Sequence, residues 1–345
     1  MGAITKCLIE KKPEYINKPP KDIKLKGNLT EDSFAYVILN NTFIVFKSIN
    51  HIIYLIYCSI DNSIVCYNLE KEQKINEIKN YHEEYITNFK HYLDKENKRD
   101  LIMTISLDDN NIRVWKIDNW ECIVNIPNIN KEGYLYSASF LYNINKLYII
   151  SSNFNLLKTP EMIKIYDING NKINEVNESN DITYIIENYY DNDLCKNYII
   201  TGNLGSVKSY TFDNKELYNK YYDKENGTHL SLLICKNQKN TNLIESCFDG
   251  NISIWNFHSG VLLNKIKISK WLTGICLFEN DYLFIGCYDK TIKLLDINNK
   301  NIIKTLEGHK DWVLTIKVIN HSKYGKCLIS QGRRKDQIKI WNIES

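Results

Sequence analysis

A short sequence motif, referred to below as the phrase, recurs along the chain and constrains its fold more than any other feature. In its fullest copy, Asp289 begins a turn, and apolar residues then alternate with polar ones through Ile292 and Leu294 to Ile297. Such alternation places one set of side chains on one face of a β-strand. Asp followed by Gly, Lys or Asn is typical of a hairpin turn, because these residues tolerate positive φ or bond their own backbone. Each copy therefore predicts a turn followed by a strand.

Seven copies of the phrase can be aligned on the large residue near the end of the strand. These residues are Tyr67, Trp115, Tyr166, Tyr210, Trp255, Leu295 and Trp341, so the steps between them are 48, 51, 44, 45, 40 and 46 residues. Steps of this size are close to the roughly 40 to 45 residues of one propeller blade. A second short apolar run precedes each copy and supplies the partner strand of the hairpin. The repeat predicts seven blades.

These residues resemble the WD-repeat family, whose blades carry a Gly-His pair, a Ser or Thr, a turn Asp and a strand Trp. The best copy is the last, with Gly308-His309 followed by Ser330 and Trp341, and the resemblance spans about residues 22 to 345. It implies an all-β fold, a seven-bladed WD-repeat β-propeller with four-stranded antiparallel blades. In that family the polar residues form a hydrogen-bonded chain from His to Asp and Ser, and on to the Trp N–H.

The resemblance assigns a structural role inside the blades to ten residues. They are His309, Ser330, Trp341, His82, Asp109, Trp115, Asp249, Trp255, Asp289 and Asp61. The third and fourth copies lack the turn Asp, and Leu295 stands where the sixth would have its Trp. We expect these degenerate blades to depend on apolar packing.

The last copy leaves no sequence for a fourth, outer strand, because only four residues follow Trp341. Residues 22–28 read like residues 303–309, the stretch that precedes the inner strand of the last blade. We therefore expect the N-terminal segment to complete the seventh blade and close the ring, which also pairs an open sheet edge. The predicted division is a tail over residues 1–21 and a propeller over residues 22–345.

Charge and composition exclude several classes of function. The 44 basic residues nearly balance the 41 acidic ones, and no long run of Lys or Arg is present, so nucleic acid is not favoured as a partner. The ten cysteines are scattered, with no C-x-x-C pair and no nearby His at a metal-ligand spacing, which predicts free thiols and no metal site. No signal peptide or transmembrane segment is apparent, so we expect a cytoplasmic or nuclear protein that is not secreted.

No nucleophile, phosphate loop or metal set stands out from the turn and blade residues, so the chain is predicted not to be an enzyme and to need no cofactor. The favoured role is a scaffold or adaptor that binds other proteins or peptide segments within a larger complex. A reader of short modified or acidic peptides and a phosphoinositide-binding propeller are the alternatives.

Two features leave contact with lipid open. Arg333, Arg334 and Lys335 form one compact basic cluster in a hairpin turn, which solvation explains better than an anion site. Gly2 invites N-myristoylation, but Lys6 occupies the position where the motif requires Ser or Thr.

The expected partner surface follows from aligning the starts of the seven inner strands on Trp312. The aligned positions hold Trp271, Tyr85, Tyr134 and Phe34, with Asp181 and His229 in the other two copies, and Phe248 and Tyr288 each precede a turn Asp on the same face. In the WD-repeat family this position lies beside the central opening. Exposed aromatic side chains dominate binding hot spots, whereas packing between blades is the competing explanation for any one ring. We expect Trp312, Trp271, Tyr85 and Tyr134 to anchor a partner segment.

Overall fold

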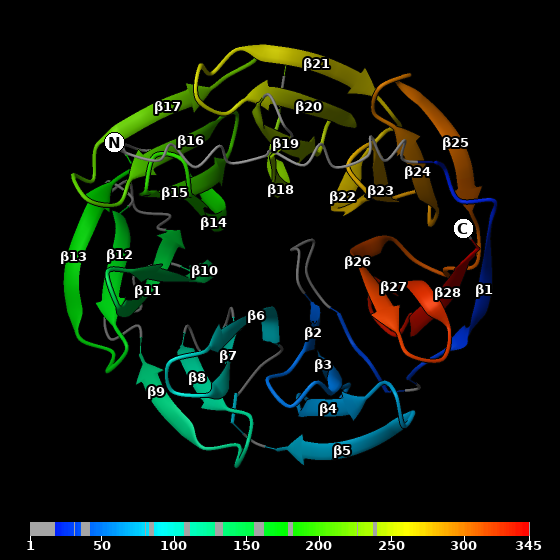
Figure 1. Ribbon diagram of the computed structural model, residues 1–345, viewed down its shortest axis with the longest axis horizontal. Helices are drawn as coiled ribbons and strands as arrows, with labels where there is room; N and C mark the ends of the chain where they lie inside the picture. Colours follow the sequence, from blue (N-terminus) through cyan, green and yellow to red (C-terminus); the bar gives the residue numbers. More distant parts are fainter. Residues whose placement is uncertain are drawn as a thin grey trace, which may run out of the picture.

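Seven four-stranded antiparallel sheets form a closed ring, which confirms the predicted all-β propeller (Figure 1). The computed structural model describes residues 18–30, 32–35, 42–79, 81–82, 86–106, 111–127, 134–154, 162–178, 182–225, 227–236 and 240–344. Within these ranges no helix is found, and therefore none that is long and apolar enough to cross a membrane.

Six of the sheets each consist of four strands that are consecutive in the sequence, and we number these blades in chain order. Blade 1 contains β2 (Phe43–Lys47), β3 (Ile53–Cys58), β4 (Ile64–Asn68) and β5 (Gln73–Ile78). Blade 2 contains β6 (Ile86–Asp94), β7 (Arg99–Ser106), β8 (Ile112–Lys116) and β9 (Cys122–Ile126). Blade 3 contains β10 (Tyr134–Asn143), β11 (Lys146–Phe154), β12 (Met162–Asp167) and β13 (Lys172–Asn177).

The next three blades repeat this order. Blade 4 contains β14 (Thr183–Asp191), β15 (Lys196–Asn203), β16 (Val207–Thr211) and β17 (Leu217–Tyr221). Blade 5 contains β18 (His229–Lys236), β19 (Thr241–Cys247), β20 (Asn251–Asn256) and β21 (Leu262–Lys267). Blade 6 contains β22 (Leu272–Phe278), β23 (Tyr282–Cys287), β24 (Ile292–Asp296) and β25 (Asn301–Leu306).

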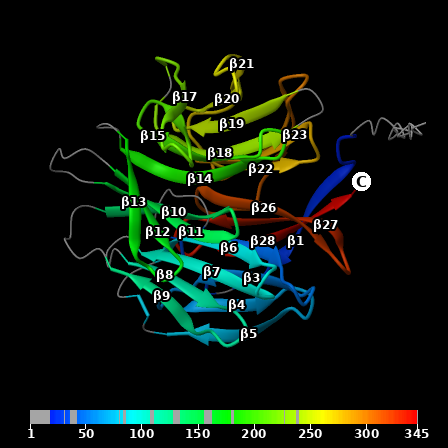
Figure 2. The ribbon, with the colours of Figure 1, turned by 60° about the vertical axis from the view of Figure 1, so that its left-hand side comes forward.

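Blade 7 joins the two ends of the chain. Its strands β26 (Val313–His321), β27 (Gly325–Gly332) and β28 (Ile338–Glu344) are followed by β1 (Asp22–Asn28) at the outer edge, as both ribbon views show (Figures 1 and 2). The register runs from Asp22 opposite Glu344 to Asn28 opposite Lys339. The closure predicted from residues 22–28 is confirmed.

A register shift marks the same point in every blade. Between the third and the outer strand, the pairing slips next to the large residue that ends each repeat, for example between Ile254 and Trp255 in blade 5 and between Leu294 and Leu295 in blade 6. In blade 7 the slip lies on β1, between Leu25 and Gly27, opposite Trp341 and Ile340. In every blade the extra residue lies on the outer strand, as Leu263 does in blade 5 and Lys26 in blade 7, so it bends that strand and increases its twist.

The hydrophobic core is divided among the junctions between neighbouring blades. Seven clusters of buried side chains lie there, each drawing on two adjacent blades. The junction of blades 6 and 7, for instance, packs Phe284 and Leu294 against Val313 and Trp341. The inner strands therefore keep one face toward the next blade and line a channel with their edges.

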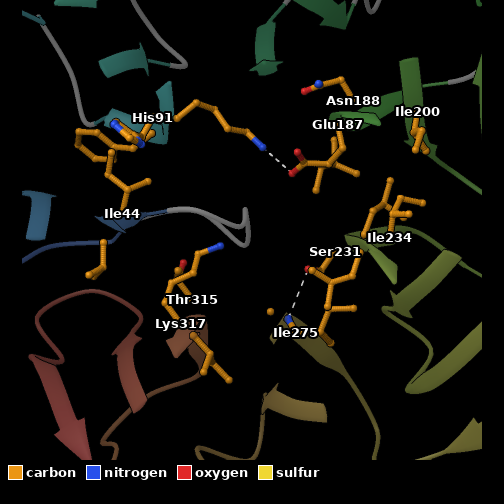
Figure 3. Close-up of a pocket in the computed structure, with 18 of the residues that line it drawn as sticks. Ile44, His91, Glu187, Asn188, Ile200, Ser231, Ile234, Ile275, Thr315 and Lys317 are labelled. Carbon is orange, nitrogen blue, oxygen red and sulfur yellow. Dashed lines mark hydrogen bonds and ion pairs between the residues drawn. The ribbon is translucent and has the colours of Figure 1, made fainter. Parts of the chain in front are cut away.

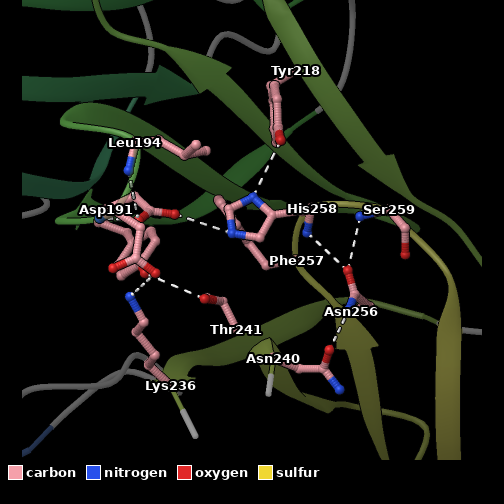
Figure 4. A network of polar contacts seen from close by, with 12 residues as sticks. Asp191, Leu194, Tyr218, Lys236, Asn240, Thr241, Asn256, Phe257, His258 and Ser259 are labelled. Carbon is pink, nitrogen blue, oxygen red and sulfur yellow. Dashed lines mark hydrogen bonds and ion pairs between the residues drawn. The ribbon is translucent and has the colours of Figure 1, made fainter. Parts of the chain in front are cut away.

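Polar contacts also tie neighbouring blades together. Between blades 4 and 5, the imidazole of His258 bridges Asp191 (Nε2 to Oδ2, 3.0 Å) and Tyr218 (Nδ1 to Oη, 3.2 Å), as Figure 4 shows. Between blades 3 and 4, the amide of Asn197 donates to the carbonyl of Tyr142 at 2.9 Å. Both contacts therefore join residues of neighbouring blades directly.

Candidate functional site

A polar chain runs through the interior of blade 7. His309 Nε2 lies 2.7 Å from the Ser330 hydroxyl, which also accepts a 2.7 Å hydrogen bond from Trp341 Nε1. His309 Nδ1 lies 2.8 Å from the Asp336 carboxylate. Gly308, which has a φ of 145°, passes so close to the Trp341 ring that an added Cβ would lie 3.2 Å from it. Gly308 thus allows the backbone to pass close to the Trp341 indole, and His309 then points its imidazole into the blade.

The charges in this chain are set by burial and by the hydrogen bonds. Burial lowers the pKa of His309 below its usual 6.5, although the Asp336 carboxylate opposes this change. Burial alone would raise the pKa of Asp336, but hydrogen bonds from His309 and from the backbone of Lys310 and Asp311 hold it below its usual range. The favoured state is therefore a neutral imidazole beside an ionised carboxylate.

Blade 2 carries the same chain with a threonine. The Thr104 hydroxyl accepts a 2.9 Å hydrogen bond from Trp115 Nε1 and lies 2.9 Å from His82 Nε2. Arg113 also reaches His82, with Nη1 2.6 Å from Nδ1. His82 and Trp115 are both buried, so this chain, like that of blade 7, lies inside the sheet.

In blade 5 a carboxylate takes the place of the hydroxyl. Glu245 accepts a 2.9 Å hydrogen bond from Trp255 Nε1 through Oε1, and its Oε2 lies 2.9 Å from His229 Nδ1. His229 was expected on the partner surface, but the structure does not place it there, since its side chain is only 1% exposed. Its backbone begins an inner strand as expected, yet its side chain turns into the blade because Glu245 and Cys247 bind it there.

Blade 4, which lacks both the Gly-His pair and the Trp, builds its own network around Glu178. Its carboxylate accepts hydrogen bonds from Thr201 (2.7 Å), Asn203 (2.6 Å) and the Tyr210 hydroxyl. Lys208 Nζ lies 3.8 Å from the same carboxylate and donates to the Glu178 carbonyl. Burial raises the pKa of Glu178, and Lys208 and the hydrogen bonds oppose this. Blade 4 therefore does not depend on apolar packing alone, contrary to the expectation.

The turn Asp residues act locally, in the hairpins between the second and third strands. Asp249 accepts from the backbone and side-chain nitrogens of Asn251. Asp289 accepts from Thr291 and Lys293, and Asp61 accepts from Ser59 and Ser63. Asp109 lies outside the described residues.

Four of the predicted partner-binding aromatics form one continuous chain of contacts, which we call the aromatic arc. Phe248 stacks on Trp271, with ring centres 5.0 Å apart, and Trp271 meets Tyr288 edge-on at 4.2 Å. Tyr288 in turn lies 4.0 Å from Trp312. All four side chains are half-buried. The arc crosses from blade 5 to blade 7 at the ends of the strands where the inner strands begin.

Cationic side chains cap two of these rings. The Arg333 guanidinium carbon lies 4.4 Å from the centre of the Trp312 ring, and Lys270 Nζ lies 5.4 Å from the centre of the Trp271 ring. Next to Arg333, Arg334 forms a backbone bridge with Ala35 of the segment that leads into blade 1. Phe34, another expected partner residue, is half-buried beside this bridge. Tyr85 and Asp181 lie outside the described residues, as does the side chain of Tyr134.

The inner strands line a channel of about 480 Å³ (Figure 3). Lys90 of β6 and Glu187 of β14 form an ion pair in it at 2.5 Å. Lys317 of β26 also lines the channel, and burial lowers the pKa of its ammonium group. The channel thus has a largely apolar lining, and its charged side chains come from strands β6, β14 and β26.

A family model described as "WD domain, G-beta repeat" matches residues 300–342, which hold the His309, Ser330 and Trp341 chain of blade 7. The match covers the last repeat, and the ring of seven four-stranded blades shows that the remaining repeats have the same architecture. The chain is a WD-repeat β-propeller protein.

Curated relatives of this WD-repeat protein match only parts of it. Myosin heavy chain kinase C of Dictyostelium discoideum is 28% identical over 25% of the chain and 11% of its own length. Autophagy-related protein 16 of Arabidopsis thaliana is 24% identical over 26% of the chain and 18% of its own length. The probable coatomer subunit beta' of Schizosaccharomyces pombe is 29% identical over 32% of the chain and 14% of its own length. The chain thus spans less than a fifth of these relatives, one of which is named as a subunit of a larger assembly.

Sequence reasoning missed the buried carboxylates of this WD-repeat protein. Glu178 and Glu245 stand in for residues of the family's polar chain, but glutamate does not belong to the family's repeat pattern. One signal was available for Glu245, because it lies ten residues before Trp255, close to the eleven that separate Ser330 from Trp341. For Glu178 no spacing of this kind identifies the partner, since blade 4 also lacks the Trp.

Proposed function

We propose that this WD-repeat propeller is a non-catalytic scaffold subunit that holds a segment of a partner protein on the aromatic arc. The observation that carries the proposal is the continuous contact from Phe248 through Trp271 and Tyr288 to Trp312, with every ring half-buried. One relative is named as a coatomer subunit, which supports an interaction role in general, and we place the protein in the cytoplasm or nucleus.

The physical properties of the arc suit binding. Large aromatic side chains offer wide contact area and lose little conformational entropy when they are covered, because each has only two rotatable side-chain bonds. The rings of the arc already hold each other in place, so a partner need not order them. Such pre-organised Trp and Tyr residues are the ones that typically dominate the binding free energy of an interface.

A second candidate, a reader of acidic segments, is favoured by the cations at the arc. Arg333 lies over Trp312 and Lys270 lies near Trp271, so an acidic side chain next to an apolar one would meet both a ring and a positive charge. An arginine whose guanidinium is oriented by a ring presents a planar fork of donors that matches a carboxylate. This second function is a more specific form of the first, because it adds an acidic side chain to the partner segment and uses the same surface.

The test compares the tagged protein with a variant carrying Trp271→Ala and Trp312→Ala. Proteins that co-purify with the parent are identified, and binding of the strongest one is then measured by titration with both purified propellers. We expect the double variant to lose binding, because it removes both indoles of the arc, while its melting temperature stays close to that of the parent.

A matched control replaces apolar side chains elsewhere. Tyr190 and Leu194 are 45% and 49% exposed and lie at the far end of β14, away from the strand starts that carry the arc. The pair Tyr190→Ala and Leu194→Ala should leave binding unchanged. If this control loses the partner as fully as the arc variant, or if a stable arc variant keeps it, the arc is not the binding surface.

A further inference from the structure

Three potential metal ligands converge in the first hairpin of blade 5. His229 is the first residue of β18 and lies directly opposite Cys247, the last residue of β19. Glu245 precedes Cys247 by two residues, so both side chains lie on the same face of β19. The hairpin thus brings an imidazole, a thiol and a carboxylate to one point, although His229 and Glu245 are 16 positions apart in the sequence.

The spacing of the three groups suits a single metal ion. His229 Nδ1 lies 2.9 Å from Glu245 Oε2 and 3.5 Å from Cys247 Sγ, and Cys247 Sγ lies 3.9 Å from Glu245 Oε1. Ligands about 2.0 to 2.3 Å from a tetrahedral ion are separated from each other by roughly 3.3 to 3.8 Å. One ligand atom from each of the three groups lies within 4.8 Å of the other two, so the groups are close enough to share one ion.

The burial of these groups is hard to explain by blade structure alone. In blades 7 and 2 a neutral hydroxyl, from Ser330 or Thr104, is enough to link the His to the Trp. Blade 5 instead buries the Glu245 carboxylate completely and places the Cys247 thiol beside it. Burying an extra negative charge is unfavourable unless a cation compensates for it.

The buried His229 ring adds a second observation. Its Nε2 atom has no hydrogen-bond partner among the described residues, in contrast to the imidazole of His309, whose two nitrogens are both bonded. His229 is therefore held only through Nδ1, the atom that faces Glu245 and Cys247. Nδ1 is therefore the atom through which His229 can join Glu245 and Cys247 at one ion.

We propose that His229, Glu245 and Cys247 bind a zinc ion inside blade 5. Thiolate, imidazole and carboxylate are each groups that bind zinc in proteins. Trp255 Nε1 donates to Glu245 Oε1 and so orients the carboxylate with Oε2 toward the other ligands, as outer hydrogen bonds commonly do around metals. Ser253, buried opposite Glu245 on β20, or a water molecule, completes the fourth position.

The site is structural, because all three ligands are buried and no substrate can reach the ion. Zinc neutralises the carboxylate and the thiolate and cross-links β18 to β19, so its binding stabilises blade 5 directly. The competing explanation is a metal-free hydrogen-bonded pair between His229 and Glu245, in which Cys247 takes no part.

The blade that follows provides a matched control. Cys287 is the last residue of β23, is fully buried, and lies opposite Leu272, as Cys247 lies opposite His229. Ile285 occupies the position that corresponds to Glu245. Cys287→Ser therefore makes the same change, at the same depth and in the same part of a hairpin, where the described residues do not form a group of three metal ligands.

The experiment uses the full chain, stripped with a chelator and titrated with Zn²⁺ and with Co²⁺, whose charge-transfer absorption reports a bond to thiolate. We expect one equivalent of either metal to bind, with the thiolate band present and a higher melting temperature at saturation. In Cys247→Ser the band should disappear and the affinity should fall at least about 100-fold, since loss of an outer partner alone costs 10- to 100-fold. Cys287→Ser should bind as the parent does.

Two results would overturn the proposal. One is a parent protein that binds less than half an equivalent of either metal, which would leave the His229 and Glu245 pair as the metal-free link. The other is a thiolate band that survives in Cys247→Ser or is lost equally in Cys287→Ser. Because Cys247→Ser changes one buried atom, its fold is checked by the melting temperature of the stripped protein, and His229→Gln provides a second variant.

Discussion

The guanidinium of Arg333 lies over the indole ring of Trp312, with its carbon 4.4 Å from the ring centre. This contact fixes a positive charge at the blade 7 end of the aromatic arc, next to the turn that holds the rest of the basic cluster. The cluster was interpreted from the sequence as a solvated turn, and Arg334 and Lys335 are indeed exposed. Arg333 differs from them because it is half-buried against a ring of the proposed binding surface.

Reversing the charge of Arg333 should weaken the capture of an acidic partner. We expect Arg333→Glu to lower the affinity about tenfold and to reduce its dependence on salt, because both a cation–ring contact and a carboxylate partner are lost. Arg334→Glu, which changes the same charge at an exposed neighbour, should have a clearly smaller effect. Titrations at low and high salt measure both, and equal effects of the two variants would show that only the overall charge of the turn matters.

Removing β1 should weaken the closure of the ring. A chain that lacks residues 1–28 loses the outer strand of blade 7 and uncovers the edge of β28, so it should unfold at a lower temperature and less cooperatively. A chain that lacks only residues 1–20 keeps β1 and should melt like the parent. Calorimetry of both truncations makes the comparison, and identical melting curves would mean that β1 contributes nothing to stability.

His309 should matter for stability and not directly for binding. Replacing it by Ala leaves Ser330 and Asp336 without their buried partner, and the expected loss is about 1 to 3 kcal/mol of unfolding free energy. Urea unfolding measures this loss, with the exposed Lys310→Ala as the control. A His309→Ala protein that is fully stable but captures no partner would instead make His309 part of the binding surface.

The stability of blade 7 should decline in mild acid. Burial lowers the pKa of His309 below 6.5, so the unfolded chain takes up a proton on this imidazole at a higher pH than the folded chain does. The unfolding free energy therefore falls as the pH drops below about 6.5, and it stays constant above that value as far as this group is concerned. Melting temperatures between pH 7.5 and 5.5 should fall less steeply in His309→Gln than in the parent. Parallel curves would contradict the lowered pKa.

The architecture was predictable because it depends on repetition. Seven phrases at blade spacing and a first segment that reads like residues 303–309 were enough to predict the ring and its closure at β1 and β28. The aromatic residues of the arc could be identified for a similar reason, since Trp271 and Trp312 occupy the same position in neighbouring repeats.

The individual polar networks could not be predicted, because they depend on which side chains the fold brings together. Glu178, which lies between β13 and β14, binds Thr201 of β15 and Tyr210 of β16, and no spacing rule connects those three residue types. His229 was assigned to the surface because its strand position matches that of Trp312, and only the geometry shows that Glu245 draws its ring into the blade.

The register of β1 on β28 also determines how the ring responds to tension. Asp22 lies opposite Glu344, so the two ends of the described chain leave blade 7 at the same corner. A force that pulls these two ends apart breaks the hydrogen bonds between β1 and β28 one after another, starting at Asp22 and Glu344. A force along the strands would instead load all of these hydrogen bonds at once. The ring therefore yields most easily by peeling at blade 7. Trp312 precedes β26, at the opposite edge of that sheet, so the outer pair can separate before the strand beside the aromatic arc is loaded.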